Sequence, residues 1–406
     1  MSGIAFFGNR GLARVVGAEA ISVAGDWVLV TAASIEVYRH TSSTAAVSVL
    51  LALAALPVLV LGPFAGAAAD RHDRRRIMLW ADLACAVVLI LALAGADTRL
   101  ALSAVFFAVG AVSVISAFDR PASEAILPLL AGPDQVGRAN SALRLGTRLA
   151  MILGPAAGGW LESVGSFRAV LVVDAFTFLG SAILVAGLAA RAPADTVGAQ
   201  AESMFRAALS GARYAARAAD IRVIVTAIGL TVLVGQIVNA GTIEFVSSEL
   251  GEPASRYGVL LAAEGAGAIA LAIFFMWVGP KLPLLPVGAL ALGLTGAATI
   301  LLGASPNIAT AIGSMAFMGI GVVGLQVAFA SYLQDRAEDA FRGRVMSFTA
   351  MVASGAGFLG LAATGPVVAL LGVRVAFTLA GGVIILAALP VVPLAAGMRR
   401  RDPGDR

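Results

Sequence analysis

AAADRHDRRRIML, residues 67–79, is a short charged turn between two long apolar runs. The run before it, Ala45 to Ala69, contains no charged residue, and the run after it, Ile77 to Ala96, contains only Asp82. Each run reaches the ~20 residues that a helix needs to cross the hydrocarbon core of a bilayer. The stretch therefore predicts two membrane-spanning helices joined by a short charged loop.

The same pattern repeats along the chain, which has 406 residues, 59% of them hydrophobic and 13% charged. This composition is too apolar for an ordinary soluble domain. We expect an all-α integral membrane protein with twelve spans, at about 12–38, 44–69, 77–96, 99–125, 138–162, 167–191, 220–248, 254–279, 282–303, 307–333, 341–371 and 373–396.

Arg and Lys indicate the orientation, because positive residues are retained on the cytoplasmic side of a membrane. With both termini in the cytoplasm, 23 of the 28 Lys and Arg fall in cytoplasmic segments. The five exceptions are Arg39, Arg99, Arg168, Arg256 and Arg374. We therefore expect a multi-pass protein of the bacterial cytoplasmic membrane. Its net charge of +4 then reflects topology and gives no reason to predict a nucleic-acid partner.

Other functional classes lack their sequence signatures. Cys85 is the single cysteine, so neither an intramolecular disulfide nor a cysteine metal cluster is expected. His40 and His72 are expected in loops, which gives no reactive constellation for an enzyme. The sequence has no Gly-Lys nucleotide-binding loop, so ATP-driven pumping is unsupported. The opening MSGIAFFGNRGLARVV lacks the pattern of a removable signal peptide, and we expect the first span to remain. No cofactor or metal is predicted.

Two halves of six spans each are indicated by the long polar interruption at 191–220. We expect an N-terminal bundle at 1–195, a cytoplasmic linker at 196–219 and a C-terminal bundle at 220–406. Within the linker, residues 204–217 predict an amphipathic helix suited to the inner membrane surface. Two six-span halves are the layout of transporters built from repeats.

Two motifs carry a resemblance to a known family. GPAAGG at 154–159 matches a fifth-span motif associated with antiporters, and the signature loop between the second and third spans is matched by Gly66, Asp70, Arg71, Arg74 and Arg75. The chain resembles the bacterial drug-efflux branch of the major facilitator superfamily, which includes macrolide and enterobactin-type siderophore exporters. The resemblance implies two six-helix bundles around a central cavity. The sequence departs from the family pattern at Asp73, where many members carry Gly, and at Ala150, where the fuller fifth-span motif has Gly. It also lacks the buried fourth-span arginine motif of many drug–proton antiporters, because Leu100 to Phe118 contains no charged residue.

The resemblance also implies a role for the charged loop. Asp70 would meet the N-terminal end of the helix near Phe341 to Val345 and so act as a conformational latch between the halves. A carboxylate at a helix N-terminus contributes about 0.3–1 kcal/mol, which suits a reversible switch. The alternative is that the arginines only determine topology.

The GPAAGG motif suggests a hinge. Pro155 removes a helix hydrogen bond, while Gly154, Gly158 and Gly159 remove side-chain bulk, so the helix can bend and approach a neighbour closely. Ordinary packing of small residues is the alternative interpretation.

Acids inside the predicted spans are candidates for proton coupling, because ionisable groups in a membrane are costly and usually functional. Asp26 and Glu264 are expected near mid-membrane, with Glu19 and Asp174 as further candidates. We expect structural or interfacial roles for Asp82, Glu36 and Glu162. The alternative for each acid is a hydrogen bond to a neighbouring helix.

Gln236, Asn239 and Gln326 are the polar candidates for contacts with a substrate, although they could instead bond neighbouring helices. Together these features predict a secondary active exporter, a proton-coupled antiporter of hydrophobic or cationic small molecules that works by alternating access. Its expected partners are a small-molecule substrate, protons and the lipid bilayer, and we expect a monomer. The alternatives are a dedicated exporter of a native metabolite such as a siderophore, and a lysophospholipid flippase.

Overall fold

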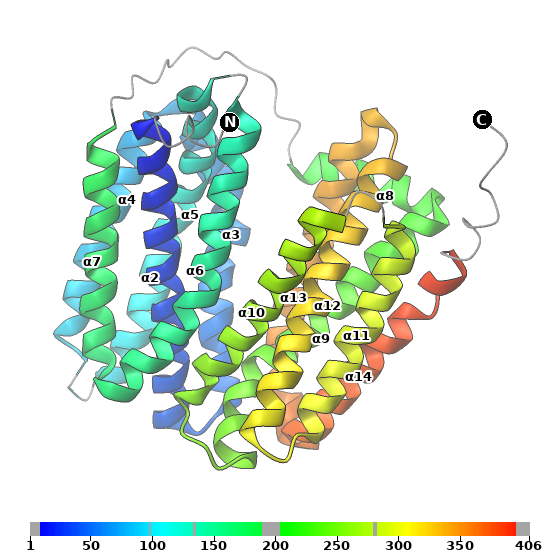
Figure 1. Cartoon of the computed structure of the whole chain (residues 1–406). Coiled ribbons are helices and arrows are strands. Elements are labelled where there is room, and N and C mark those ends of the chain that lie inside the picture. The colour runs from blue at the N-terminus through cyan, green and yellow to red at the C-terminus, as the bar shows by residue number, and fades with distance from the viewer. Residues whose placement is uncertain are drawn as a thin grey trace. The chain divides into compact units, whose positions relative to one another are not determined.

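A computed structural model describes residues 9–96, 98, 100–132, 135–188, 204–278 and 282–394. Throughout these ranges the regular structure is helical, without strands, which confirms the all-α prediction (Figure 1). The elements are α2 (Arg10–Thr41), α3 (Thr44–Arg71), α4 (Arg74–Leu93), α5 (Ala101–Ala131), α6 (Val136–Val164), α7 (Phe167–Ala186), α8 (Met204–Arg217), α9 (Ala219–Glu244), η2 (Phe245–Glu249), α10 (Arg256–Val278), α11 (Leu284–Ala304), α12 (Ile308–Arg336), α13 (Asp339–Leu371) and α14 (Val373–Ala388).

Eleven segments within the described residues are long and apolar enough to cross a membrane. The remaining long helix is α6, whose 29 residues include the whole of the predicted span at 138–162. Its apolar character is diluted by Arg138, Arg144 and Arg148, all of which are exposed. Long basic side chains near a helix end can reach the membrane surface while their stems stay in lipid, so these arginines are compatible with a twelfth span.

The chain divides into two compact units, Met1–Ala199 with Ala254–Val259, and Gln200–Pro253 with Leu260–Arg406. In the N-terminal unit, α2 contacts α3, α5, α6 and α7 and therefore forms its centre. Leu12, Val15, Ile126 and Leu127 lie in its apolar core. This central position brings the acids of α2 into the interior of the unit.

In the C-terminal unit, α11 packs between α12 and α14, and α9 packs on α13 and α14. Gly296 of α11 and Gly381 of α14 let two backbones meet, since a Cβ on Gly296 would lie 2.7 Å from the Gly381 carbonyl oxygen. Small residues at helix crossings are the usual means of close packing in membranes. Phe245, Phe329 and Phe377 are fully buried in the core of this unit.

The amphipathic helix predicted at 204–217 is present with the same bounds, as α8. Gly211 packs against α13, where a Cβ would lie 2.1 Å from the carbonyl oxygen of Arg344. Tyr214 stacks on Phe341 with 4.8 Å between ring centroids. The buried face of α8 therefore rests on a helix of the C-terminal unit, while Arg213 and Arg217 are exposed.

Some boundaries predicted from the apolar runs differ from the helix ends in the structure. The third span begins at Arg74 rather than Ile77, because Asp73 caps the helix: its Oδ1 accepts hydrogen bonds from the backbone N–H of Arg75 at 3.0 Å and of Arg76 at 3.3 Å. The fourth span continues to Ala131 and contains Pro121 and Pro128. His40 lies in the last turn of α2 and not in a loop.

Candidate functional site

A cavity of about 460 Å³, lined by apolar side chains and a few polar ones, lies within the C-terminal unit. It brings together Gln236 and Asn239 of α9, Glu264 of α10 and Gln326 of α12, residues that are up to 90 positions apart in the chain (326 − 236). The candidates for substrate contact and one of the candidates for proton coupling therefore share a single cavity.

Glu264 is positioned by an unusually close helix contact. Gly319 of α12 faces the backbone of α10, and a Cβ at that position would lie 1.8 Å from the Glu264 carbonyl oxygen. One turn further along α10, Gly267 meets the Ala316 carbonyl oxygen in the same way. The two glycines allow α10 and α12 to touch, and this contact fixes where the Glu264 side chain emerges.

Hydroxyl and thioether groups complete the cavity wall. Thr295 and Thr299 donate hydrogen bonds to backbone carbonyls one turn earlier, at 2.8 Å each. Thr231 differs: its side chain is buried and its Oγ1 has no hydrogen-bond partner among the described residues. Met315 and Met318 contribute flexible apolar surface. The cavity thus combines one carboxyl group, three amides and an unsatisfied hydroxyl with an apolar wall.

The N-terminal unit contains a second group of polar side chains, which consists of carboxyl groups in its interior. Asp174 of α7 is fully buried. Its Oδ1 accepts a hydrogen bond from the Thr177 hydroxyl at 3.0 Å, whereas Oδ2 is buried without a partner in the described structure. It lies against α2 at Gly25, next to Asp26, and the charges of Asp26 and Asp174 interact.

Glu19 and Asp26 of α2 follow the sequence prediction, with buried Ser22 between them. Glu19 is buried, and its Oε2 has no partner among the described residues. The Asp26 side chain is only partly enclosed, but its Oδ1 is buried and likewise unpartnered there. The charges of these two acids also interact.

Two further acids of this group were not among the proton-coupling candidates predicted from the sequence. Asp119 of α5 is buried, with an unpartnered Oδ1 in the described structure, and its charge interacts with those of Glu19, Asp82 and Asp26. Asp82 of α4 is buried and accepts a hydrogen bond from the Ser181 hydroxyl at 2.7 Å. Asp119 could have been found by its position inside a predicted span. We refer to Glu19, Asp26, Asp82, Asp119 and Asp174 as the acid cluster.

No ion pair joins the acid cluster to Arg or Lys within the described ranges. The basic residue whose charge acts on Glu19 and Asp26 is Arg120, but it lies on the exposed side of α5 and pairs with Glu124 at 3.8 Å. Glu162 provides a contrast, since it forms an ion pair with Arg39. Glu162 is therefore paired with a cation, whereas the carboxyls of the cluster have no compensating cation in the described structure.

The signature loop consists of two residues, His72 and Asp73, because Asp70 and Arg71 end α3 and Arg74 starts α4. The Asp70 side chain is 75% exposed and lies 4.0 Å from Arg74. Gly66 faces open space, with no neighbouring atom within 4 Å of the position that a Cβ would take. Exposure leaves Asp70 accessible to a partner segment, as a latch requires.

Arg75 lies at the opposite side of this loop and has a defined structural role. Its Nε donates a hydrogen bond to the Val185 carbonyl at 3.2 Å, and its Nη2 donates to the Ala186 carbonyl at 2.5 Å. These carbonyls lie at the C-terminal end of α7, where the helix dipole attracts a cation. Arg75 thus joins α4 to α7 inside the N-terminal unit.

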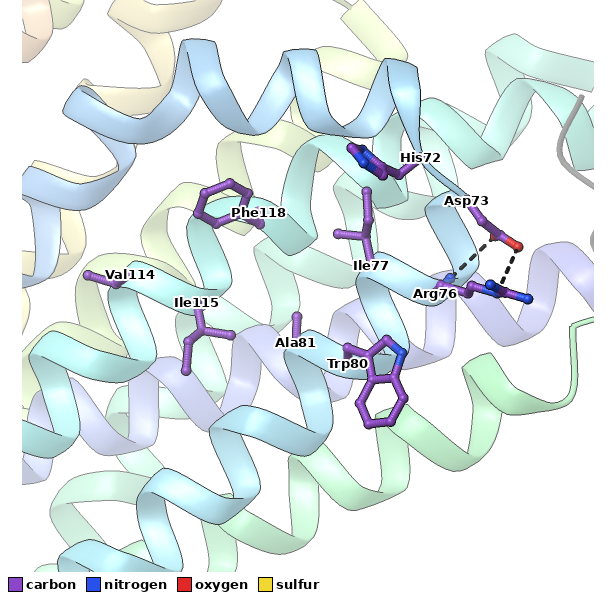
Figure 2. A pocket seen from close by; sticks show the side chains of 9 residues that line it. All are labelled: His72, Asp73, Arg76, Ile77, Trp80, Ala81, Val114, Ile115 and Phe118. Carbon is purple, nitrogen blue, oxygen red and sulfur yellow. Dashed lines mark hydrogen bonds and ion pairs between the residues drawn. The ribbon is translucent and has the colours of Figure 1, made fainter. Parts of the chain in front are cut away.

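A groove of about 560 Å³ adjoins the loop and is bordered by α4 and α5. Figure 2 shows Asp73 and Arg76 joined at one end, with Trp80 and Phe118 further along. The Trp80 side chain is 67% exposed. The wall of the groove is almost entirely apolar, which suits a surface that faces lipid.

The GPAAGG motif lies where α6 crosses α2. A Cβ on Gly154 would lie 2.5 Å from the Trp27 Cβ, and one on Gly158 would lie 2.7 Å from the Val28 carbonyl oxygen. Gly159 faces residues 254–259 of the same unit, with the Ser255 carbonyl oxygen 2.6 Å from such a Cβ. Pro155 lies within the helix, which continues on both sides of it. Each glycine is therefore required by a close approach.

Curated proteins with similar sequences are membrane transporters. The chain is 27% identical to "Uncharacterized MFS-type transporter YfiS" of Bacillus subtilis (strain 168), over 95% of this chain and 93% of that protein. It is 29% identical to "Macrolide efflux protein A" of Streptococcus pyogenes, over 41% and 42% of the two chains. It is also 29% identical to "Putative bacilysin exporter BacE" of Bacillus amyloliquefaciens, over 41% of each.

The fold also matches solved transporter structures. The crystal structure of a mutant of the nucleoside transporter NupG matches with a TM-score of 0.75 at 13% identity, over 95% of this chain and 99% of that one. The family model of the Major Facilitator Superfamily matches residues 15–245 and 224–406, nearly the whole chain. With its all-helical architecture and its membrane-spanning segments, this chain belongs to the Major Facilitator Superfamily and is a multi-pass membrane transporter.

Proposed function

We propose that this transporter is a secondary active exporter that exchanges hydrophobic or cationic small molecules for protons by alternating access. The observation that carries the proposal is the acid cluster, whose buried carboxyls lack a compensating cation in the described structure. The similarity to a macrolide efflux protein and to a putative exporter supports the outward direction.

The energetic cost of a charge inside the membrane explains why the acid cluster supports proton coupling. A charged side chain inside a membrane helix costs at least about 2.5–3.5 kcal/mol, so such residues persist where a function needs them. A carboxyl group without a basic partner avoids this cost by holding a proton. When the protein opens to water, the same group can release the proton. We assign this loading and release to Asp26 and Asp174, with Glu19 and Asp119 beside them.

Energy for export must come from an ion gradient in this scheme, since the sequence contains no nucleotide-binding Gly-Lys loop. The conformational latch at Asp70 and the hinge at Gly154, Pro155, Gly158 and Gly159 would provide the movement. The transporter would act in the bacterial cytoplasmic membrane, with both termini in the cytoplasm.

A second candidate function is export of one native metabolite, which the similarity to a putative bacilysin exporter favours. Both functions use the same fold and the same proton site. They differ in substrate range, so a panel of chemically unrelated compounds separates them: a dedicated exporter would respond to one chemical class alone.

Inverted membrane vesicles test the coupling. Respiration acidifies their interior, and an antiporter then releases protons when substrate is added outside, which a pH-sensitive dye reports. We expect macrolide or amine substrates to trigger proton release with the wild type. Asp26→Asn and Asp174→Asn should abolish it, whereas Glu124→Gln, which removes an exposed carboxylate of the same unit, should not. Full proton release by both buried-site variants at wild-type expression would refute the assignment.

A further inference from the structure

We propose that the cavity of the C-terminal unit binds hydrophobic organic amines, with the Glu264 carboxylate holding the ammonium group. The inference rests on the proposed function only in taking the ligand of this cavity to be the exported molecule. It assigns Glu264 to substrate recognition and leaves proton loading to the acid cluster of the other unit.

The charge of the cavity lining selects for a cation. Glu264 is its only ionisable side chain among the described lining residues, and neither Lys nor Arg is present there. A lone carboxylate removed from water is costly unless it is paired or protonated. An ammonium group supplies the missing pair, whereas an anionic ligand would add a second uncompensated negative charge. The cavity therefore accepts cations and rejects anions.

The polar groups that line the cavity with Glu264 suit the additional N–H donors of a primary or secondary amine. Gln236 and Gln326 each carry an amide oxygen that can accept a hydrogen bond. Thr231 adds a buried hydroxyl whose Oγ1 has no partner in the described structure, which is the arrangement that a ligand would relieve. Leaving a buried polar group unsatisfied destabilises the protein. A ligand that bonds Thr231 recovers this cost, and the unliganded protein does not.

The rest of the lining fits an apolar body on the same molecule. Leu261, Met315, Met318, Leu325 and Phe329 surround the polar groups. Methionine side chains adapt to different shapes, which suits a site for varied compounds. The volume of about 460 Å³ lies in the range of pockets for small organic ligands. A compact hydrophobic amine satisfies the charge, the hydrogen bonds and the apolar wall together.

Equilibrium binding to the purified full-length protein tests this proposal without any proton gradient. One probe is a dansyl group linked to a dimethylamino terminus, and its matched control carries an isopropyl group in place of dimethylamino. The two have nearly the same shape, but only the first is cationic at neutral pH. We expect the wild type to bind the amine at least tenfold more tightly than the neutral probe.

Single substitutions test which residues cause the preference for the amine probe. Glu264→Gln should abolish the preference for the amine while still binding the neutral probe, which shows that the cavity is intact. Thr231→Val should weaken binding of the primary-amine analogue of this probe, which has N–H donors to spare beyond the one that Glu264 accepts, more than it weakens binding of the dimethylamino probe. Asp335→Asn, which removes an exposed carboxylate of the same unit, should change neither probe. Equal affinities in the wild type, no binding of the amine, or an undiminished preference in Glu264→Gln would each overturn the proposal.

A measurement on the wild type covers the case in which Glu264→Gln fails to fold. A hydrophobic carbodiimide modifies carboxyl groups in membranes, and mass spectrometry identifies the modified residue. The tertiary amine cannot couple to the activated carboxyl, so it should protect Glu264 while the neutral probe does not. Modification of Glu264 at the same rate with either probe would exclude the site. None of these results depends on proton-driven transport, so failure here and failure of the proposed function are distinguishable.

Discussion

Gly25 of α2 and Asp174 of α7 lie so close together that a Cβ on Gly25 would fall 2.1 Å from the Asp174 Oδ1. It would also fall 2.2 Å from the Thr177 Oγ1, which donates the hydrogen bond to that carboxyl group. A single methyl group at position 25 therefore cannot be accommodated unless Asp174 moves. Because Gly25 of α2 has no side chain, the buried Asp174 side chain of α7 has room beside it.

Gly25→Ala should displace Asp174 and so impair proton coupling without removing any carboxyl group. Overpacking of this kind costs on the order of 1–3 kcal/mol, so we expect a lower Tm and a large loss of substrate-triggered proton release. The control is Gly17→Ala, on the same helix and facing the same neighbour, where the new Cβ would meet Leu184 at an ordinary 3.5 Å. Equal activity of the two variants would contradict a role for this contact.

Gly158→Leu should impair transport, because the Val28 carbonyl oxygen leaves no room for a side chain where α6 crosses α2. Gly180→Leu is a suitable control in the same unit, since no atom lies within 4 Å of its Cβ position. Gly187 is less suitable, because a side chain there would meet the Arg14 guanidinium. Wild-type transport by well-expressed Gly158→Leu would reduce the motif to tolerant packing.

Asp70 and Asp73 should respond differently to substitution, although both lie in the charged stretch between α3 and α4. Asp73→Ala removes a helix cap and should lower the free energy of unfolding by about 0.5–2 kcal/mol, visible as a lower Tm in detergent. Asp70→Asn removes an exposed carboxylate and should leave the Tm unchanged, yet cut transport strongly if the latch operates. The latch would be discarded if Asp70→Asn transported normally at equal expression.

The orientation inferred from the arginines can be measured with topology reporters. A reporter fused after Arg75 should be active only in the cytoplasm, and one fused after Ser255 should be active only outside it. Accessibility of single cysteines placed at these two positions in a Cys85→Ser background gives an independent check. The opposite pattern at both positions would mean the inverted orientation, and the opposite pattern at one position alone would require a different number of spans between them.

Sequence patterns predicted the helices well because bilayer thickness fixes how long an apolar run must be. The same reasoning could not locate helix ends that depend on capping. From the sequence, Asp73 is only one residue of a charged loop. In the structure its carboxylate accepts hydrogen bonds from two backbone N–H groups, and α4 therefore begins three residues before the apolar run.

The buried acids show a second limit of sequence reasoning. Asp119 is followed directly by Arg120 and soon by Glu124, so this stretch resembles an exposed cytoplasmic end. The structure continues α5 to Ala131, which places Asp119 well inside the helix and turns it toward the interior while Arg120 faces outward. Depth along a helix could be estimated from the sequence, but the facing direction of a single acid depends on which neighbours pack around it.

The separation of the acid cluster from Glu264 also determines how membrane voltage would act on transport. When one proton enters for each monovalent cation that leaves, no net charge crosses the membrane, and only the pH difference drives the exchange. When the exported molecule is neutral, each cycle carries one positive charge inward, and 100 mV contributes about 2.3 kcal/mol. A potassium diffusion potential at equal pH on both sides should therefore accelerate export of a neutral compound and leave export of an amine unaffected. The charge of the exported molecule would then determine whether the transport cycle is electrogenic.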